Sequence, residues 1–201
     1  MFWRLVFLII YIAFFLVRSR YGNKKPNRKE AIEYFDEQNL ALQREGRLSM
    51  TLRSILSFIM LLSIIIYGIS PSWLQFFNLP LPNFLRLAGL GLAIAILPFL
   101  YWAHRALGRH YSPDLDLKEG HKLITSGPYN IVRHPMYTIL IVFMLSISIV
   151  SASALILIPH TAAILLLIMR LDKEEAMLIE EFGDDYREYM IKTGRLLPKF
   201  N

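Results

Sequence analysis

The hydrophobic residues of this chain are gathered in long blocks that polar segments separate. Four blocks stand out, at residues 2–17, 55–69, 84–103 and 136–169. The last holds 34 residues, and a single helix of that length would rise about 50 Å against a hydrocarbon core of roughly 30 Å. Two helices must therefore share it. We place the turn at residues 151–153, which are small and polar enough for an interface, and predict five membrane-spanning helices.

A turn at Pro159 is the alternative. It would leave a last span of nine residues, from 161 to 169, which cannot cross the hydrocarbon core unless the helix continues into polar sequence.

The positions of Lys and Arg predict the orientation, because cytoplasmic loops carry an excess of these residues. Three segments hold nine, five and six of them: residues 18–53, 105–133 and 170–201. The loop at residues 71–83 holds none. With five spans and the amino terminus outside, 20 of the 22 basic residues lie on one face, and only Arg4 and Arg86 fall on the other. We therefore predict a cytoplasmic carboxy terminus. The first span lacks a small-residue cleavage site, so it is predicted to be an anchor.

Composition agrees with an integral membrane protein. Hydrophobic residues make up 55% of the 201 residues, and the mean hydropathy is +0.41. The chain has no cysteine, which excludes disulfides, thiolate metal ligands and a cysteine nucleophile. Membrane orientation explains the net charge of +6 better than nucleic acid does, because no basic cluster is interleaved with aromatic residues on a soluble module. His104 and His110 lack partners at metal-ligand spacing, so we predict no metal.

Other polar and small residues have structural interpretations. Residues 27–46 favour a helix that ends at Gly46, either on the membrane surface or as a solvated linker. His160 is interpreted as a packed, neutral histidine near the exported end of the fifth span. Two small-xxx-small pairs in the third span favour close helix packing: Gly89 with Ala93, and Gly91 with Ala95.

The unusual polar residues lie after residue 104, on the predicted cytoplasmic face. In the stretch GPYNIVRHPMY, Pro135 suits the first turn of a helix, and His134 then takes the capping position. Free N–H groups at this helix start, with Arg133 beside them, would make an anion-binding corner. Alternatively, Arg133 and His134 reach toward lipid headgroups, and the flanking tyrosines form part of an interfacial belt.

A second polar feature begins at Arg170, where the last apolar block ends. The stretch RLDKEEAMLIEEFGDDYREYMIKTGRLLP predicts an acidic helix that breaks near Gly183. Arg170 and Glu174 would share one helical face, although an ion pair of this kind is common on surfaces and contributes little. The hairpin between the fourth and fifth spans brings the anion corner next to Glu174 and Glu175. Such a site could hold a zwitterion, with its carboxylate toward the helix start and its amine toward glutamate.

These motifs resemble those of a known family of membrane enzymes. The pattern G-x-Y-x-x-x-R-H-P-x-Y is followed about forty residues later by R-x-x-x-E-E-x-x-L-x-x-x-F-G-x-x-Y-x-x-Y and a closing R-x-x-P. Together they resemble the isoprenylcysteine carboxyl methyltransferase family and, more loosely, the phospholipid methyltransferases. The resemblance covers residues 120–198, and the amino-terminal hundred residues match only as spans.

The predicted spans and the resemblance together indicate an all-α integral membrane protein in two parts. Residues 1–104 would form the first three spans and the linker helix, and residues 105–201 the cytoplasmic-face catalytic region with the last two spans. S-Adenosylmethionine would be the cofactor, Arg170 would face the acceptor, and Arg133, Arg170 and Glu174 would form the catalytic set. The residues implied in cofactor binding are His121, Lys122, Leu123, Ile124, Tyr129, His134, Pro135, Met136, Tyr137 and Glu174.

The implied reaction is methyl transfer to a lipophilic acceptor from the bilayer, most simply a carboxylate of isoprenylcysteine type that becomes a methyl ester. A carboxylate is already ionised at neutral pH and needs no general base. An amine acceptor, as in phospholipid methylation, would need one, and no residue stands out for that role. Two further alternatives stay open. Membrane sterol reductases carry a similar R-H-P-x-Y motif but bind NADPH, and a non-catalytic protein could have kept the same scaffold.

Overall fold

The computed structural model describes residues 1–22, 46–69, 71–108 and 123–199, and these residues are almost entirely helical. The elements in chain order are α1 (Phe2–Gly22), α3 (Arg47–Ile69), η1 (Ser72–Phe77), α4 (Asn83–Leu107), η3 (Gly127–Asn130), α5 (Pro135–Ser151), α6 (Ala154–Phe182) and α7 (Asp184–Lys192). In this part of the chain, extended pairing is limited to two isolated bridges, Asn78 with Ser153 and Val132 with Gly194. The predicted all-α class is confirmed.

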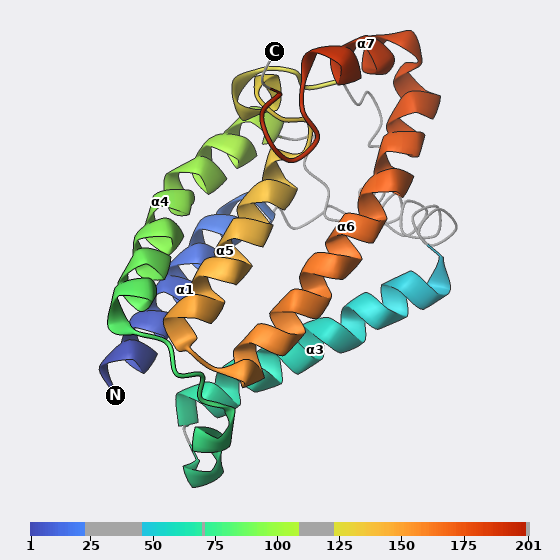
Figure 1. The fold of residues 1–201 in the computed structure, drawn as a ribbon. Coiled ribbons are helices and arrows are strands. Elements are labelled where there is room, and N and C mark those ends of the chain that lie inside the picture. Colours follow the sequence, from blue (N-terminus) through green and yellow to red (C-terminus); the bar gives the residue numbers. More distant parts are fainter. Residues whose placement is uncertain (23–45, 70, 109–122, 200–201) are drawn as a thin grey trace.

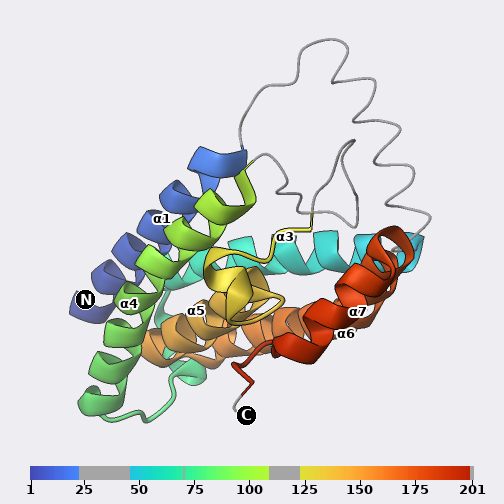
Figure 2. The same cartoon turned by 90° about the horizontal axis from the view of Figure 1, so that it is seen from above.

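Successive long helices run in alternating directions, so their connections gather at two ends of the molecule (Figure 1). The amino terminus, η1 and the α5–α6 turn lie at one end, while η3, α7 and the segment after α7 lie at the other. α5 packs against α1, α4 and α6, and α3 packs against α6. Seen from above, α4 and α1 lie on one side of α5, and α3 and α6 on the other (Figure 2).

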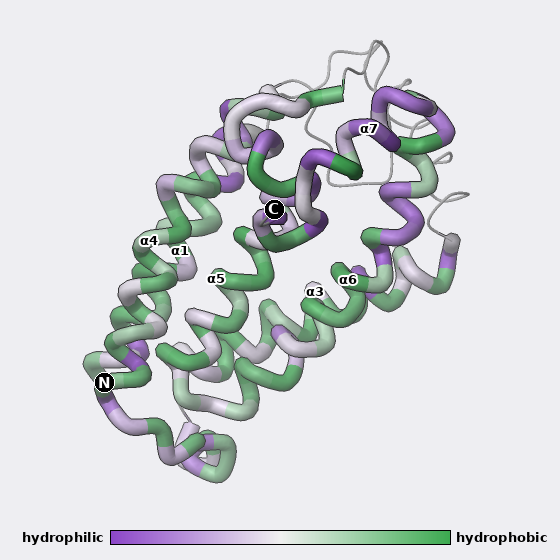
Figure 3. Tube along the Cα trace, turned by 45° about the horizontal axis from the view of Figure 1, so that its top comes forward, coloured by the Kyte–Doolittle hydropathy of each residue, from purple (hydrophilic) through white to green (hydrophobic). Residues whose placement is uncertain are grey.

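Four helices of the described chain are long and apolar enough to cross a membrane, namely α1, α3, α4 and α6. α5 is apolar too but has only 17 residues. Hydrophobic residues run along the helices, and hydrophilic ones gather around α7 (Figure 3). Many large apolar side chains point outward, including Phe58 and Leu61 of α3, as expected of helices that face lipid. The predicted apolar blocks thus correspond to helices, and a count of five spans stays a prediction.

The turn between α5 and α6 lies where the sequence predicts it. α5 ends at Ser151, Ala152 adopts the left-handed conformation with φ of 48°, and α6 begins at Ala154. α6 then continues through Pro159 into the polar sequence, so the predicted fifth span and the start of the acidic helix are one helix. It ends at Phe182, and Gly183, with φ of 55°, separates it from α7 as predicted.

Side chains from other helices bind the carbonyls at the end of α5. The guanidinium of Arg86 donates from Nε and Nη2 to the carbonyl of Val150, at 3.0 and 2.7 Å, and lies 4.5 Å from the centre of the Trp3 ring. The hydroxyl of Tyr67 donates to the carbonyl of Ser151 at 2.9 Å. The last carbonyls of a helix lack partners within the helix and carry partial negative charge, so a cation is favourable there. This contact gives Arg86, an exception to the charge pattern, a structural role.

Close packing of α4 against α5 depends on one of the two predicted small-residue pairs. Gly89 and Ala93 are buried, and a Cβ on Gly89 would approach the carbonyl oxygen of Ser146 to 2.9 Å. Gly91 and Ala95 lie on the exposed face of α4, and nothing lies within 4 Å of a Cβ built at Gly91. Close packing is confirmed for Gly89 and Ala93. For Gly91 and Ala95 the prediction is wrong, because no other helix of the described chain packs against them. Packing uses one face of the helix, and these pairs lie on different faces.

His160 is buried between α1 and α5, in agreement with its interpretation as a packed histidine. Its Nδ1 lies 3.0 Å from the hydroxyl of Ser148, and its Nε2 lies 3.5 Å from the hydroxyl of Tyr11. These contacts give both ring nitrogens a polar neighbour inside an apolar bundle, where an unpaired polar group would be costly. The helix predicted at residues 27–46 lies outside the described residues except for Gly46.

Candidate active site

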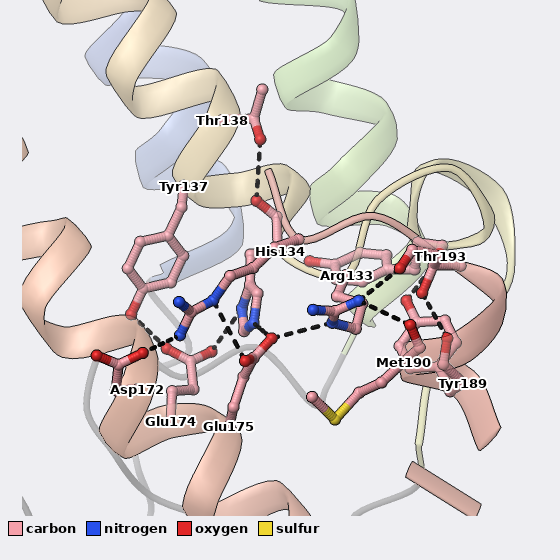
Figure 4. Close-up of polar contacts among 12 residues, drawn as sticks. Arg133, His134, Tyr137, Thr138, Asp172, Glu174, Glu175, Tyr189, Met190 and Thr193 are labelled. Atoms are coloured by element: carbon pink, nitrogen blue, oxygen red, sulfur yellow. Dashed lines mark hydrogen bonds and ion pairs between the residues drawn. The ribbon is translucent and has the colours of Figure 1, made fainter. Parts of the chain in front are cut away.

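Three segments that are distant in sequence meet at the α7 end of the molecule: the start of α5, the polar half of α6 and the segment after α7 (Figure 4). His134 is the N-cap of α5 and Pro135 is its first residue, as predicted. The α5–α6 hairpin then returns the chain to the same end, where Glu174 and Glu175 lie beside His134. The predicted meeting of the helix start with the carboxylate pair is therefore present.

Glu175 is surrounded by three basic side chains. Its Oε1 accepts a hydrogen bond from Nε of Arg133 at 2.9 Å and lies 3.2 Å from Nε2 of His134. Its Oε2 lies 3.2 Å from Nε of Arg195, an ion pair without hydrogen-bond geometry. The side chain is only 11% exposed. Groups of the protein itself thus neutralise both oxygens of this carboxylate.

Glu174 has weaker partners and is more open. Its Oε1 lies 3.5 Å from Nδ1 of His134, and its Oε2 accepts a hydrogen bond from the hydroxyl of Tyr137. The side chain is 23% exposed. Because one partner is at long range and the other is a neutral phenol, Glu174 keeps more capacity than Glu175 to bind an external cation.

The imidazole of His134 is buried between the two carboxylates. Burial by itself lowers the pKa of His134, because it disfavours the charged form. Hydrogen bonds and the negative charges of Glu174 and Glu175 act in the opposite direction and outweigh burial, so the pKa of His134 is raised above its ordinary value. The site therefore stabilises the imidazolium form of His134 more than water does.

Arg133 binds protein groups. In addition to Glu175, its guanidinium donates to the carbonyls of Met190, at 3.2 Å, and of Thr193. These contacts fasten α7 to the start of α5. The corner that the sequence assigns to an external anion is thus filled by the carboxylate of Glu175. A catalytic role for Arg133 stays a prediction, and its contacts favour a supporting one.

Arg170 is buried on α6, one turn before Glu174. Its charge interacts favourably with that of Glu174, as expected of an i, i+4 pair on one helical face. The structure therefore brings together Arg170, Glu174, His134 and Tyr137 from the predicted set. The roles of these residues in binding and catalysis stay predictions.

The other predicted cofactor contacts are less closely joined to this group. Leu123 and Ile124 are half-buried in the segment before η3. Tyr129 is buried, and its carbonyl accepts a hydrogen bond from the hydroxyl of Tyr189 on α7. Pro135 and Met136 are buried in the first turn of α5, where Met136 belongs to the apolar core. His121 and Lys122 lie outside the described residues.

The segment after α7 contributes to the site, and the site residues predicted from the sequence do not include it. The carbonyl of Gly194 accepts a hydrogen bond from the N–H of Arg133 at 2.8 Å, and the carbonyl of Arg195 accepts one from the N–H of His134 at 3.1 Å. The hydroxyl of Thr138 donates to the carbonyl of Leu196 at 2.7 Å. The closing R-x-x-P of the second motif, which begins at Arg195, was the available signal for this contact.

A small cavity of about 220 Å³ lies next to this region. None of the predicted cofactor residues is among those lining it, which are Thr125, Asn130, Asp185, Glu188, Tyr189, Lys192 and Thr193. Among the described residues, no group of three or more His, Asp or Glu side chains could hold a metal ion.

Comparisons with known proteins point to one family. The sequence model of the isoprenylcysteine carboxyl methyltransferase family matches residues 89–180. A protein-S-isoprenylcysteine O-methyltransferase from Xenopus laevis is 33% identical over 81 residues, which are 40% of this chain and 28% of that protein. The fold is similar to a solved structure of the eukaryotic intramembrane Ras methyltransferase, an isoprenylcysteine carboxyl methyltransferase. The TM-score is 0.51 at 17% identity, over 96% of this chain and 92% of the other.

These findings confirm the resemblance that the motifs indicate. The aligned region spans little more than a quarter of the Xenopus protein. The structural likeness extends over nearly the whole chain and concerns the fold. The four long apolar helices of this chain indicate an integral, multi-pass membrane protein.

Proposed function

We propose that this chain is a membrane methyltransferase that moves a methyl group from S-adenosylmethionine to a carboxylate of a lipophilic, isoprenylcysteine-type acceptor. One observation carries the proposal. The R-H-P-x-Y motif and the R-x-x-x-E-E motif, which lie about forty residues apart, meet in space, with His134 between Glu174 and Glu175. The match to the family over residues 89–180, which include both motifs, supports the same activity.

The donor set at this meeting point fits the amino acid part of the cofactor. Glu174 is the more exposed carboxylate of the pair, and its ion pair with His134 is longer than the contacts that Glu175 makes, so Glu174 is the better placed of the two to bind an ammonium group. Tyr137, which is bonded to Glu174, offers an aromatic face to a sulfonium. Bound S-adenosylmethionine would supply an electrophilic methyl group here. His134, whose pKa the two carboxylates raise, would orient Glu174, and a carboxylate acceptor that is already ionised would need no base.

Arg170 is the residue that we assign to the acceptor. It is buried where the apolar part of α6 gives way to the polar part, the place where a lipophilic molecule with a charged end would present its carboxylate. A guanidinium can bind a carboxylate through two parallel hydrogen bonds and so fix its direction. The carboxylate is the nucleophile, and catalysis then depends on alignment with the methyl group and on exclusion of water.

The membrane placement is part of the proposal. We assign the α7 end, with the site, to the cytoplasm and the end that carries η1 to the other side, because the basic residues concentrate in the segments that precede and follow the site. A water-soluble cofactor would then enter from the cytoplasm, and a lipophilic acceptor would enter from the bilayer.

Titration calorimetry on the detergent-solubilised protein tests the cofactor. We expect S-adenosylhomocysteine to bind and Glu174→Ala to weaken its affinity roughly tenfold or more, because a hydrogen-bonded charge pair typically contributes about 1.5–3 kcal/mol. NADPH should not bind. Binding of NADPH alone would point to a reductase, and binding of neither ligand would point to a non-catalytic scaffold.

Methyl transfer to a short isoprenylcysteine with a free carboxylate tests the acceptor. We expect Arg170→Ala to lower kcat and leave the affinity for S-adenosylhomocysteine within about threefold, because its guanidinium serves the acceptor. The same compound with its carboxylate amidated is the control and should not react. If Arg170→Ala abolished cofactor binding and Glu174→Ala spared it, the two roles would have to be exchanged.

A further inference from the structure

The segment that follows α7 runs alongside the start of α5 and is bonded to it at several points. Val132 and Gly194 form a parallel bridge. The N–H groups of Arg133 and His134 donate to the carbonyls of Gly194 and Arg195. Because these N–H groups precede the first helical turn of α5, the segment supplies partners that the helix cannot supply itself. The carboxy-terminal segment thus forms one wall of the site.

Arg195 joins this wall to α6. Its Nη2 donates to Oδ1 of Asp172 at 2.6 Å, and its Nε lies 3.2 Å from Oε2 of Glu175. Its side chain is 34% exposed, so neither ion pair alone would contribute much to the stability of the fold. Of its two partners, Glu175 is the one that contacts His134. Since Arg195 faces one oxygen of this carboxylate, the other oxygen points to Arg133 and His134.

We propose that Arg195 is a positioning residue of the candidate site: it holds the carboxylate of Glu175 against His134, and His134 in turn orients Glu174. The chain of contacts consists of two ion pairs on one ring. Oε1 of Glu175 lies 3.2 Å from Nε2 of His134, and Oε1 of Glu174 lies 3.5 Å from Nδ1 of His134. The expected effect on cofactor binding rests on the proposed function. The expected effect on the pKa of His134 rests on these contacts alone.

Removal of Arg195 has two opposite consequences for His134. Loss of a nearby cation by itself raises the pKa of an imidazole, whereas release of Glu175 from its place lowers it. The positioning role therefore predicts a lower pKa of His134 in Arg195→Gln, against the direction expected from charge alone. The other groups near the ring are unchanged in this variant, namely Glu174 on α6, Tyr137 on α5 and the neighbouring Arg133. Tyr186 of α7 interacts with Glu174 and Glu175 and is also unchanged.

Histidine titration by NMR on the isotope-labelled, solubilised chain measures this pKa. The chain has five histidines, and the spectrum of His134→Gln identifies the signal of His134. We expect a lower pKa in Arg195→Gln and an intermediate one in Arg195→Lys, because an ammonium group can reach only one of the two carboxylates at a time. An unchanged or raised pKa in Arg195→Gln would overturn the proposal.

Two matched controls separate positioning from general loss of ion pairs. Asp172→Asn removes the second partner of Arg195 and spares the contact with Glu175. Arg187→Gln removes a cation from an exposed pair with Asp184 on α7. Both should leave the pKa of His134 as it is in the parent chain. If Asp172→Asn lowered this pKa as much as Arg195→Gln does, the contact with Glu175 would not be the cause.

The affinity for S-adenosylhomocysteine gives the functional readout. We expect Arg195→Gln to weaken binding roughly tenfold, because Glu174 would lose the orientation that a charge-assisted hydrogen bond to the ligand needs, and Arg195→Lys to restore part of it. The KM for the acceptor should stay within about twofold, because Arg170 is untouched. Failure of the parent chain to bind S-adenosylhomocysteine would refute the proposed function, and the titration of His134 would still decide the positioning role.

Discussion

Glu174 and Glu175 are neighbours in the chain, yet their side chains have different surroundings. Three basic side chains lie within 3.2 Å of Glu175, whereas Glu174 has His134 at 3.5 Å, a hydrogen bond from Tyr137 and the charge of Arg170 one helical turn away. Successive residues of a helix point about 100° apart, so two adjacent carboxylates meet different walls of the same site. We therefore propose a structural role for Glu175 and a cofactor-binding role for Glu174.

Substitution of Glu175 should be costly to stability. Removal of one partner from a buried ion pair typically costs about 3–5 kcal/mol, because the remaining charges are left uncompensated. We expect Glu175→Gln to lower the thermal unfolding midpoint of the solubilised protein markedly. Glu188 is the control: it pairs with Lys192 at 2.9 Å, but both side chains are about two-thirds exposed, so Glu188→Gln should change little. Equal effects of the two substitutions would contradict the assignment.

His134 should make stability depend on pH. Its pKa is raised in the folded state, so the folded protein binds the proton more tightly than the unfolded chain does. The stability that this group contributes is therefore fully present below the unfolded pKa of about 6.5. It is lost as the pH rises through the folded pKa. The difference in unfolding midpoint between the parent chain and His134→Gln should narrow as the pH rises from 6 upward. A difference that stays constant, or widens, would contradict the raised pKa.

Among the secondary-structure elements, α5 is the one that holds the site in place. It packs against α1, α4 and α6, and both of its ends are bonded by other segments. Arg86 and Tyr67 bind its last carbonyls, and the segment after α7 binds the N–H groups before its first turn. A helix of 17 residues is thereby held at both ends, which keeps His134 at a defined height relative to α6.

The α4–α5 contact can be tested at Gly89. A Cβ there would approach the backbone of α5 to 2.9 Å, so Gly89→Val must separate the two helices. We expect a loss of about 1–3 kcal/mol, the usual cost of overpacking, seen as a lower thermal unfolding midpoint. Gly91→Val, two residues along on the exposed face, adds the same side chain without a neighbour and should be tolerated. Similar destabilisation by both would show that helix propensity and not packing is responsible.

At the scale of the whole molecule, the alternating helices separate two ends of different chemistry. One end carries the uncharged loop at residues 71–83 and the α5–α6 turn, and the other carries the site and the charged helix α7. Chemistry that needs both a polar cofactor and a lipophilic acceptor fits the charged end, where the apolar part of α6 meets its polar part.

The orientation can be tested with single cysteines, because the chain has none of its own. Phe76 in η1 is 93% exposed, and the side chain of Asp184 at the start of α7 is 97% exposed. With the site in the cytoplasm, a membrane-impermeant maleimide added to intact cells should label Phe76→Cys, and should label Asp184→Cys only after permeabilisation. The opposite pattern would invert the proposed topology, and labelling of both in intact cells would contradict the separation of the two ends.

The sequence by itself determined the helical class, the α5–α6 turn, the start of α5 at His134 and Pro135, and the break at Gly183. These features depend on local chemistry: runs of apolar residues, the fixed φ of proline and the conformational freedom of glycine. The motif pair also predicted that the start of α5 would meet Glu174 and Glu175, because an antiparallel hairpin brings its two open ends together.

Only the tertiary structure decided how the charges at that meeting point are distributed. It showed that Arg133 is engaged with Glu175 and two carbonyls, and that Arg195 closes the same carboxylate from the other side. It also separated Gly89, which faces α5, from Gly91, which does not. The reason is the same in each case. A sequence shows which residues share a helix, but the partner that a side chain meets depends on how the helices are rotated and on where a distant segment returns.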